Sequence, residues 1–481
     1  MRYGALFILV LLVAPRLWCQ GLGAPHYPER LRADLEVLKA AIQEAHPAPY
    51  RYITRGELDS AFDALADSLY TPLSSDGFLA RLLPVLQRIG DANLDVQLDA
   101  ATEQRLLAQA TLLPFRVRLI EGDVYIAEEL KGFRTFPQGS RLISVDGLAT
   151  HRLIAGMSAW VVRDGANETL RLRVIEERFA WLFLLAFGYS GSYAVEVEAP
   201  DGRRLEEVVV GMRLEDIERS RKPDGLAMHP WQSTWDPAAG ALWVSIRSLD
   251  PLVLEGSGQK PRAFIDAMLR ELKDNRARVL VLDLRGCGGR ELGMAELVFS
   301  AIATDPFRVV ESMYVSAAQL TALAGVAEIP VEHLASVQHN YLPARHGTAM
   351  LHPDDPRLQD VAPHRHAYQG KVYVVCDGAT RDAGAAVVML AKRSGRARVV
   401  GEETGTNAHS FTGGRELMVT APNTGVRLRI PLVRYVPSGV AAGEADRGEA
   451  PHHLVSPQPW GVAKGRDTVR LALMRMIREL Q

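Results

Sequence analysis

Apolar side chains recur every three or four positions through the first part of the chain, from residue 30 to residue 98. Such spacing places them along one side of an amphipathic helix. The pattern predicts a helix that ends near His46, a second over 55–69, and a third that begins at Ser74, whose hydroxyl suits a helix N-terminus. We therefore expect an N-terminal helical module over residues 26–100.

From about residue 105 the apolar period shortens to two, which is typical of β-strands, and short alternating segments lie on both sides of a helix-like stretch. The segment Gly139 to Gly147, Gly-Ser-Arg-Leu-Ile-Ser-Val-Asp-Gly, resembles the strand and turn that precede the binding-groove helix of PDZ domains. This resemblance implies a PDZ-like domain over 105–215. In such a domain an extended peptide adds as a strand to a sheet edge, and the alternative role is that of a spacer packed on the core.

The next part of the chain alternates apolar runs with helical patterns, which is typical of a mainly parallel sheet in an α/β fold. We expect this core over residues 225–460 and a C-terminal helix over 461–481. The stretch 305–370 is less regular, and its role stays open. The buried strands are predicted by three apolar runs, at 241–246, 279–284 and 372–375.

The first residues do not fit this globular pattern. Arg2 precedes an unbroken apolar run over residues 5–14, too short to cross a bilayer but typical of a signal peptide. We expect cleavage after Cys19 and export to the periplasm or the extracellular space. A lipidated Cys19 would associate the protein with a membrane, although Trp18 is bulky for that signal. No later segment is long and apolar enough to span a membrane.

Composition narrows the function further. The chain has 55 basic and 57 acidic side chains and a formal net charge of -2, which gives no reason to expect nucleic acid as a partner. Three cysteines exclude a disulfide-stapled scaffold. The histidine clusters lack the spacing and acidic partner of a zinc peptidase, so we predict no metal and no cofactor.

Three strings, taken together, carry a more specific resemblance. Residues 281–289, Val-Leu-Asp-Leu-Arg-Gly-Cys-Gly-Gly, resemble a strand and loop of the tail-specific, or C-terminal processing, serine peptidases of family S41. Residues 372–384 and 395–405 resemble two further motifs of that family at the family's own separation, and weaker likenesses lie at 89–91 and 447–451. The resemblance implies a crotonase-like α/β peptidase core behind PDZ-like and helical modules.

In this family a serine at a helix N-terminus attacks the peptide carbonyl, and a lysine or histidine takes its proton. The resemblance places Asp382 at the serine position, Asn407 at the lysine position and Asn93 at the histidine position. An asparagine cannot accept a proton at neutral pH. The family's catalytic positions are therefore substituted, and the ordinary peptidase machinery is absent.

The glycine-rich loop is retained, and the resemblance implies that the amides of Gly286, Gly288 and Gly289 hold the oxyanion. Asp382 precedes a predicted helix and is a residue type favoured as an N-cap. We hypothesise that its carboxylate fills the oxyanion space and closes the site. The alternative is a helix cap without a role in the groove.

Cys287 leaves three interpretations open. It is a buried, inert thiol; or it pairs with Cys376 in a disulfide, which export permits; or it is a surrogate nucleophile beside His409 or His452. The leading functional hypothesis is an exported pseudopeptidase that binds an extended peptide or a protein C-terminus. The alternatives are a hydrolase with a repurposed nucleophile and a structural partner of another envelope protein.

Overall fold

The computed structural model describes residues 24–130, 134–220, 229–318, 320, 323, 325–328, 331–440 and 446–479. The predicted signal peptide, residues 1–19, lies outside these ranges. Within them, no helix combines the length and the apolar character that crossing a membrane requires.

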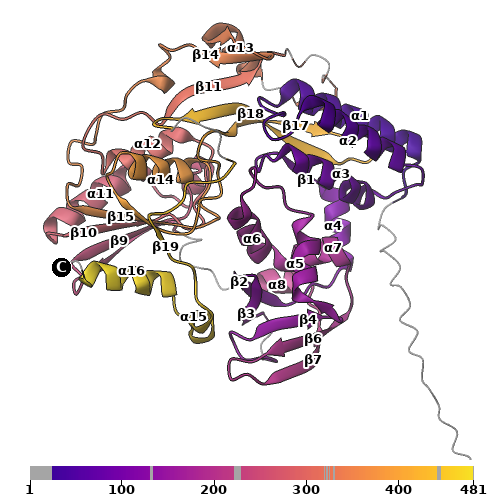
Figure 1. Cartoon of the computed structure of the whole chain (residues 1–481), viewed down its shortest axis with the longest axis horizontal. Helices are drawn as coiled ribbons and strands as arrows, with labels where there is room; N and C mark the ends of the chain where they lie inside the picture. The colour runs from indigo at the N-terminus through magenta and orange to yellow at the C-terminus, as the bar shows by residue number, and fades with distance from the viewer. Residues whose placement is uncertain are drawn as a thin grey trace, which may run out of the picture.

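The predicted N-terminal helices are confirmed. Thr54 begins the second with a capping box, in which its hydroxyl accepts from the Glu57 amide and the Glu57 carboxylate accepts from the Thr54 amide. Ser74 caps the third through the amide of Gly77. Figure 1 shows these helices lying on the strands β17 and β18. The elements here are α1 (Pro28–Ala45), α2 (Arg55–Ser68), α3 (Ser75–Ile89), β1 (Asp95–Gln97) and α4 (Ala100–Gln109).

The next sheet is antiparallel, with the strand order β2-β3-β4-β6-β7 and β5 paired to β4. The inward face of each strand is apolar and packs on α5, α6 and α7, as the alternating pattern predicts. Its elements are β2 (Phe115–Ile120), β3 (Asp123–Glu129), β4 (Arg141–Val145), β5 (Leu148–Ala149), α5 (Thr150–Ser158), α6 (Glu168–Glu177), α7 (Phe179–Phe187), β6 (Ser192–Glu198), β7 (Arg204–Val210) and α8 (Leu214–Ser220).

The predicted α/β core is confirmed. Its sheet has the order β19-β16-β15-β10-β9-β8, and all neighbouring strands except β8 and β9 run parallel. Helices α11, α12 and α14 cover one face and α16 covers the other (Figure 1). The elements are β8 (Trp231–Asp236), β9 (Ala241–Ile246), α10 (Pro251–Gly256), α11 (Pro261–Asp274), β10 (Val279–Asp283), α12 (Leu292–Ser300), β15 (Lys371–Cys376), α14 (Ala383–Arg393), β16 (Arg398–Gly401) and β19 (His453–Leu454).

A third sheet joins the core to the N-terminal helices, in the order β12-β17-β18-β11-β14-β13 with β1 paired to β18. Much of the irregular stretch 305–370 contributes to it. Its two long strands share one apolar core with α1, α2 and α3. The elements are β11 (Val310–Ser316), β12 (Ala327–Glu328), α13 (Val331–Asn340), β13 (Tyr341–Pro343), β14 (Thr348–Leu351), η2 (Pro356–Leu358), β17 (Phe411–Thr420) and β18 (Arg427–Pro437).

The C-terminal region differs from the single helix expected over 461–481. It contains α15 (Pro459–Lys464) and α16 (Thr468–Glu479), separated at Gly465. Gly465 ends α15 in the left-handed conformation, with φ 60°, which glycine adopts without the steric cost that other residues bear.

Candidate active site

Two loops that follow adjacent parallel strands form the floor of the site. β10 pairs with β15, so the glycine loop after β10 and the turn after β15 leave the same edge of the sheet. The loops lie against each other: the amide of Arg381 donates to the carbonyl of Cys287 and the amide of Ala383 donates to that of Gly289, both at 2.9 Å. A Cβ on Gly384 would stand 2.5 Å from the Cys287 carbonyl oxygen, so only glycine fits there.

Asp382 is the residue at the bend between this turn and α14. Its backbone has φ 52° and ψ -122°, a strained conformation for a residue with a side chain. Its amide donates to the hydroxyl of Thr406 at 2.7 Å. The side chain is 7% exposed, and burial raises the pKa of its carboxyl group.

The expected N-cap role of Asp382 is wrong, because its side chain makes no capping hydrogen bond to α14. The strained backbone turns the carboxylate away from the first turn of the helix and toward the N-terminal part of the chain. There Oδ1 accepts from the side-chain amide of Asn93 at 3.0 Å. Among the described residues, no hydrogen bond joins this carboxylate to the amides of Gly288 or Gly289. The hypothesis that this carboxylate fills the oxyanion space required a hydrogen bond to these amides, and that bond is not formed.

Asn93 reaches Asp382 from the loop after α3, 289 residues away in the chain. The same Nδ2 donates to the carbonyl of Thr412 at 2.9 Å. Both neighbours are acceptors, so the amide nitrogen, not the amide oxygen, must face them. Asn93 thus presents a proton donor to Asp382 and has no group there that accepts a proton.

Asp91 holds this asparagine in place. Its Oδ1 accepts from the backbone amide of Asn93 at 2.8 Å and from the hydroxyl of Thr412 at 2.8 Å. The Nε2 atom of His46 lies 2.9 Å from Oδ2. Burial acts to raise the pKa of Asp91, but the contacts with His46, Thr412 and Asn93 outweigh it and hold the pKa below its usual value.

Among the described residues, no hydrogen bond joins Asn407 to Asp382, although the neighbouring Thr406 accepts one from the Asp382 amide. The Nδ2 of Asn407 donates to the hydroxyl of Tyr52 at 2.7 Å, and its Oδ1 accepts from the amide of His409 at 2.8 Å. Tyr52 in turn donates to Asp164 at 3.1 Å, and the other carboxylate oxygen of Asp164 accepts from the Asn407 amide at 2.9 Å. Burial and the nearby charge of Asp91 raise the pKa of Asp164 to about 7.

The glycine loop keeps a backbone amide that forms no hydrogen bond within the described part of the fold. The amide of Gly286 donates to Asp377 at 2.9 Å, so it is already occupied. The carbonyl of Gly288 accepts from Leu249 at 2.6 Å. Gly288 pairs with Ser248 in an isolated parallel bridge, so its amide faces the neighbouring strand. Within the described part of the chain, the amide of Gly289 has no hydrogen-bond acceptor, and it remains the candidate oxyanion donor.

Cys287 is poorly suited to be a nucleophile. It is fully buried, and burial raises the pKa of its thiol far above the usual value, whereas reactive cysteines need the thiolate. No contact between Cys287 and His409 is present among the described residues. Cys287 and Cys376 are both free thiols, so the disulfide interpretation is wrong for this structure. The Cys376 thiol instead donates to the carbonyl of Glu402 at 3.2 Å.

Helix α6 occupies an open edge of the antiparallel sheet. β2 is an edge strand, and the amide of Leu119 donates to Glu176 at 3.0 Å. The carbonyl of Leu119 accepts from Arg173 at 2.6 Å. Arg173 also lies 3.5 Å from Glu402 of the core. A peptide that adds as a strand beside Leu119 must therefore displace this Arg173–Glu176 clasp.

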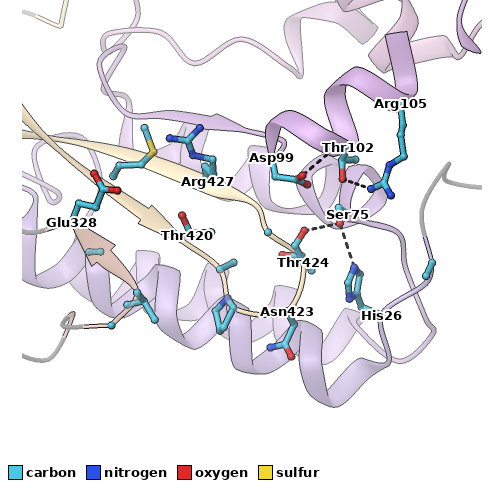
Figure 2. A pocket seen from close by; sticks show the side chains of 18 residues that line it. His26, Ser75, Asp99, Thr102, Arg105, Glu328, Thr420, Asn423, Thr424 and Arg427 are labelled. Atoms are coloured by element: carbon cyan, nitrogen blue, oxygen red, sulfur yellow. Dashed lines mark hydrogen bonds between the residues drawn. The ribbon is translucent and has the colours of Figure 1, made fainter. Parts of the chain in front are cut away.

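A separate polar pocket, of about 730 Å³, lies between the first turns of α3 and α4 and the turn that joins β17 to β18. Figure 2 shows that His26, Ser75 and Thr424 point toward one another there. Ser75 is 3.3 Å from His26, but its hydroxyl donates to the carbonyl of Thr424 at 2.7 Å. Because the Ser75 hydroxyl donates its proton to a backbone carbonyl, it does not donate to His26. Ser75 and His26 are therefore not arranged as a nucleophile and its base. The described residues also contain no group of histidine, cysteine and carboxylate side chains able to hold a metal ion.

Several residues of the site were missed by sequence reasoning. His46, Tyr52, Asp164, Thr406 and Thr412 come from separate segments, and no local motif marks them. The likeness at residues 89–91 pointed to Asp91 but not to its contacts. Only long-range hydrogen bonds bring these side chains together.

The glycine loop and the bend before α14 lie within residues 252–452, and this region matches the model of peptidase family S41. The core of the chain therefore belongs to that family. No curated protein matches the chain.

Solved structures extend the fold comparison beyond the core. Mature CPAF is similar at 16% identity and a TM-score of 0.65, over 94% of this chain and 98% of that one. A structure of mature CPAF complexed with lactacystin has 17% identity, the same TM-score and the same coverage. The photosystem II D1 C-terminal processing protease has 14% identity and a TM-score of 0.42, over 92% and 98% of the two chains. At these identities the CPAF likeness shows the fold alone.

Proposed function

We propose that this chain is an exported member of family S41 that binds extended peptides or protein C-termini without cleaving them. One observation carries the proposal: the Asp382–Asn93 pair stands at the family's serine and histidine positions. Peptide cleavage needs a nucleophile beside a group that removes its proton. Here a carboxylate accepts a hydrogen bond from an amide, so neither partner can play its family role.

Other features support binding. The amide of Gly289 has no acceptor among the described residues and suits a peptide carbonyl or a terminal carboxylate. The proposal includes export, because Arg2 and the apolar run at 5–14 resemble a signal peptide. The working-hydrolase alternative through Cys287 is opposed by the burial of that thiol.

The first experiment measures cleavage by mass spectrometry on a mixed library of unstructured peptides, together with binding of the same library. We expect saturable binding and no new termini above the buffer blank for the natural chain. New termini from the natural chain, abolished by Asp382→Ala, would show that Asp382 itself acts in hydrolysis. Absence of both cleavage and binding would favour the structural-partner alternative.

A gain-of-function pair sharpens this test. Asp382→Ser with Asn93→His should introduce measurable cleavage, because Asn93 already lies within hydrogen-bond distance of Asp382. A general base contributes about 10²–10⁴-fold to the rate. Asp382→Ser with Asn407→Lys is the matched control and should stay inactive, because Asn407 is bonded to Tyr52. Equal activity in the two double variants would contradict the assignment of Asn93 as the base position.

A further inference from the structure

An open pocket of about 820 Å³ lies between α10, the start of α11 and the first turns of α12. This volume lies within the usual range of ligand sites. Its apolar lining includes Leu254, Met294 and Leu297. None of the residues discussed above as catalytic positions lines it.

The pocket begins where the glycine loop ends. A Cβ on Gly289 would stand 2.5 Å from the carbonyl carbon of Leu249, so the loop presses directly on the residues before α10. Two residues beyond this contact, Pro251 lines the pocket from one side and Glu291 lines it from the other. A peptide whose carbonyl meets the amide of Gly289 therefore has a neighbouring side chain within reach of this pocket.

The charges around the pocket are unevenly buried. Glu255 and Glu291 are exposed acids at the rim, and Lys260 and Arg262 are exposed bases there, so the rim is electrically balanced. Glu296 on α12 is different because it is half-buried. It has no hydrogen bond or ion pair among the described residues, and burial alone raises the pKa of its carboxyl group. A cation placed beside Glu296 would offset that cost.

We propose that this pocket takes the side chain of a lysine or arginine from the bound peptide, with the cation at Glu296. Such side chains have an apolar stem and a charged end. The stem fits the surface of Leu254, Met294 and Leu297, and the charged end complements the half-buried carboxylate. The inference rests on the proposed peptide-binding function and adds the class of side chain that the site selects.

The test compares fluorescent pools of unstructured peptides that carry lysine, norleucine or glutamate at one fixed position and are randomised elsewhere. Norleucine keeps the apolar stem without the charge. We expect the lysine pool to bind about tenfold more tightly than the norleucine pool, as a charge-assisted contact implies. Glu296→Gln should remove most of this preference, and Glu255→Gln at the rim should keep it. Equal binding of the two pools, or a preference that survives Glu296→Gln, would overturn the inference.

A second measurement separates this inference from the proposed function. The full chain, with labelled methionine methyl groups, is titrated with n-butylguanidinium and with neutral n-pentanol, and the Met294 signal is followed by NMR. A saturable shift with the cation, absent in Glu296→Gln, supports the pocket even if no peptide pool binds. That result would refute the proposed peptide binding and support the cation site at Glu296. No cation-specific shift, or the same shift in Glu296→Gln, refutes the site.

Discussion

Asp382 lies at a bend where the two loops of the site meet. Its strained backbone costs about 1–3 kcal/mol, which the contacts of the two loops on either side must supply. Such strain suits a residue that projects its side chain into a site. In this chain the side chain is a buried carboxylate, held by Asn93 and not by α14.

At the residue scale we predict a pH dependence of stability from Asp164. Its folded pKa of about 7 lies above the usual value of an aspartate, so the folded state holds this proton more tightly than the unfolded state does. Its contribution to the free energy of unfolding should therefore fall as the pH rises from about 4 through 7. Urea unfolding measured at pH 5 and at pH 8 gives the free energy of unfolding at each pH. Between these two pH values, that free energy should decrease by about 1–2 kcal/mol less in Asp164→Asn than in the natural chain.

The control for this pH experiment is Asp274→Asn, at an exposed position at the end of α11. It should leave the pH profile unchanged. Parallel profiles for the natural chain and Asp164→Asn would contradict the raised pKa of Asp164.

At the scale of the element, α6 connects the antiparallel sheet to the walls of the site. Its cap residue Asn167 is fully buried and donates to the carbonyl of Thr404 at 2.7 Å. That burial also makes Asn167 inaccessible in the folded chain, although its sequence, Asn-Glu-Thr, fits a glycosylation acceptor. Farther along, the Arg173–Glu176 clasp occupies the backbone of Leu119. One helix therefore contacts both the edge strand β2 and the loop after β16.

We predict that the clasp protects the β2 edge. Glu176→Ala removes the acceptor of the Leu119 amide, and exchange of that amide with solvent should become about tenfold faster, as expected for the loss of one charge-assisted hydrogen bond. Hydrogen exchange followed by NMR or mass spectrometry measures this directly. Glu177→Ala, at the exposed neighbouring position, should leave the exchange rate unchanged. Unchanged exchange in Glu176→Ala would show that the edge is protected by other contacts.

At the scale of the whole molecule, the N-terminal helices and the two longest strands form one folding unit. Asp34 of α1 is fully buried and accepts four hydrogen bonds from the turn between β17 and β18. Its partners are the backbone and side-chain donors of Asn423 and Thr424. Hydrogen bonds between residues almost 400 positions apart in the chain thus hold α1 against this turn.

We predict that Asp34→Ala destabilises this unit by about 3 kcal/mol, because it leaves several buried donors without an acceptor. Urea unfolding, followed by tryptophan fluorescence and by circular dichroism, should show the loss. Glu36→Ala, on the exposed side of the same helix, is the control and should change stability by less than about 0.5 kcal/mol. A separate early transition confined to the N-terminal helices would contradict the shared core.

The sequence alone determined the features that depend on neighbouring residues. Apolar periodicity predicted the N-terminal helices and the parallel core, because 3.6- and 2-residue periods follow directly from helix and strand geometry. Motif spacing predicted family S41 for the core, which the family model matches, and it placed Asp382 at the position of that family's serine. The expected C-terminal helix is present as α16, and the left-handed turn at Gly465 separates it from α15.

Only the tertiary structure decided which distant side chains meet. Local spacing carries no information on a contact between residues 93 and 382, or on whether a hydrogen bond joins Asn407 to Asp382. Burial is equally a property of the whole fold. It makes Cys287 a poor nucleophile, and it raises the pKa of Glu296, which has no hydrogen-bond or ion-pair partner among the described residues. The reaction that a site can support depends on these long-range contacts and on burial, because they set which atoms donate, which accept and which are charged.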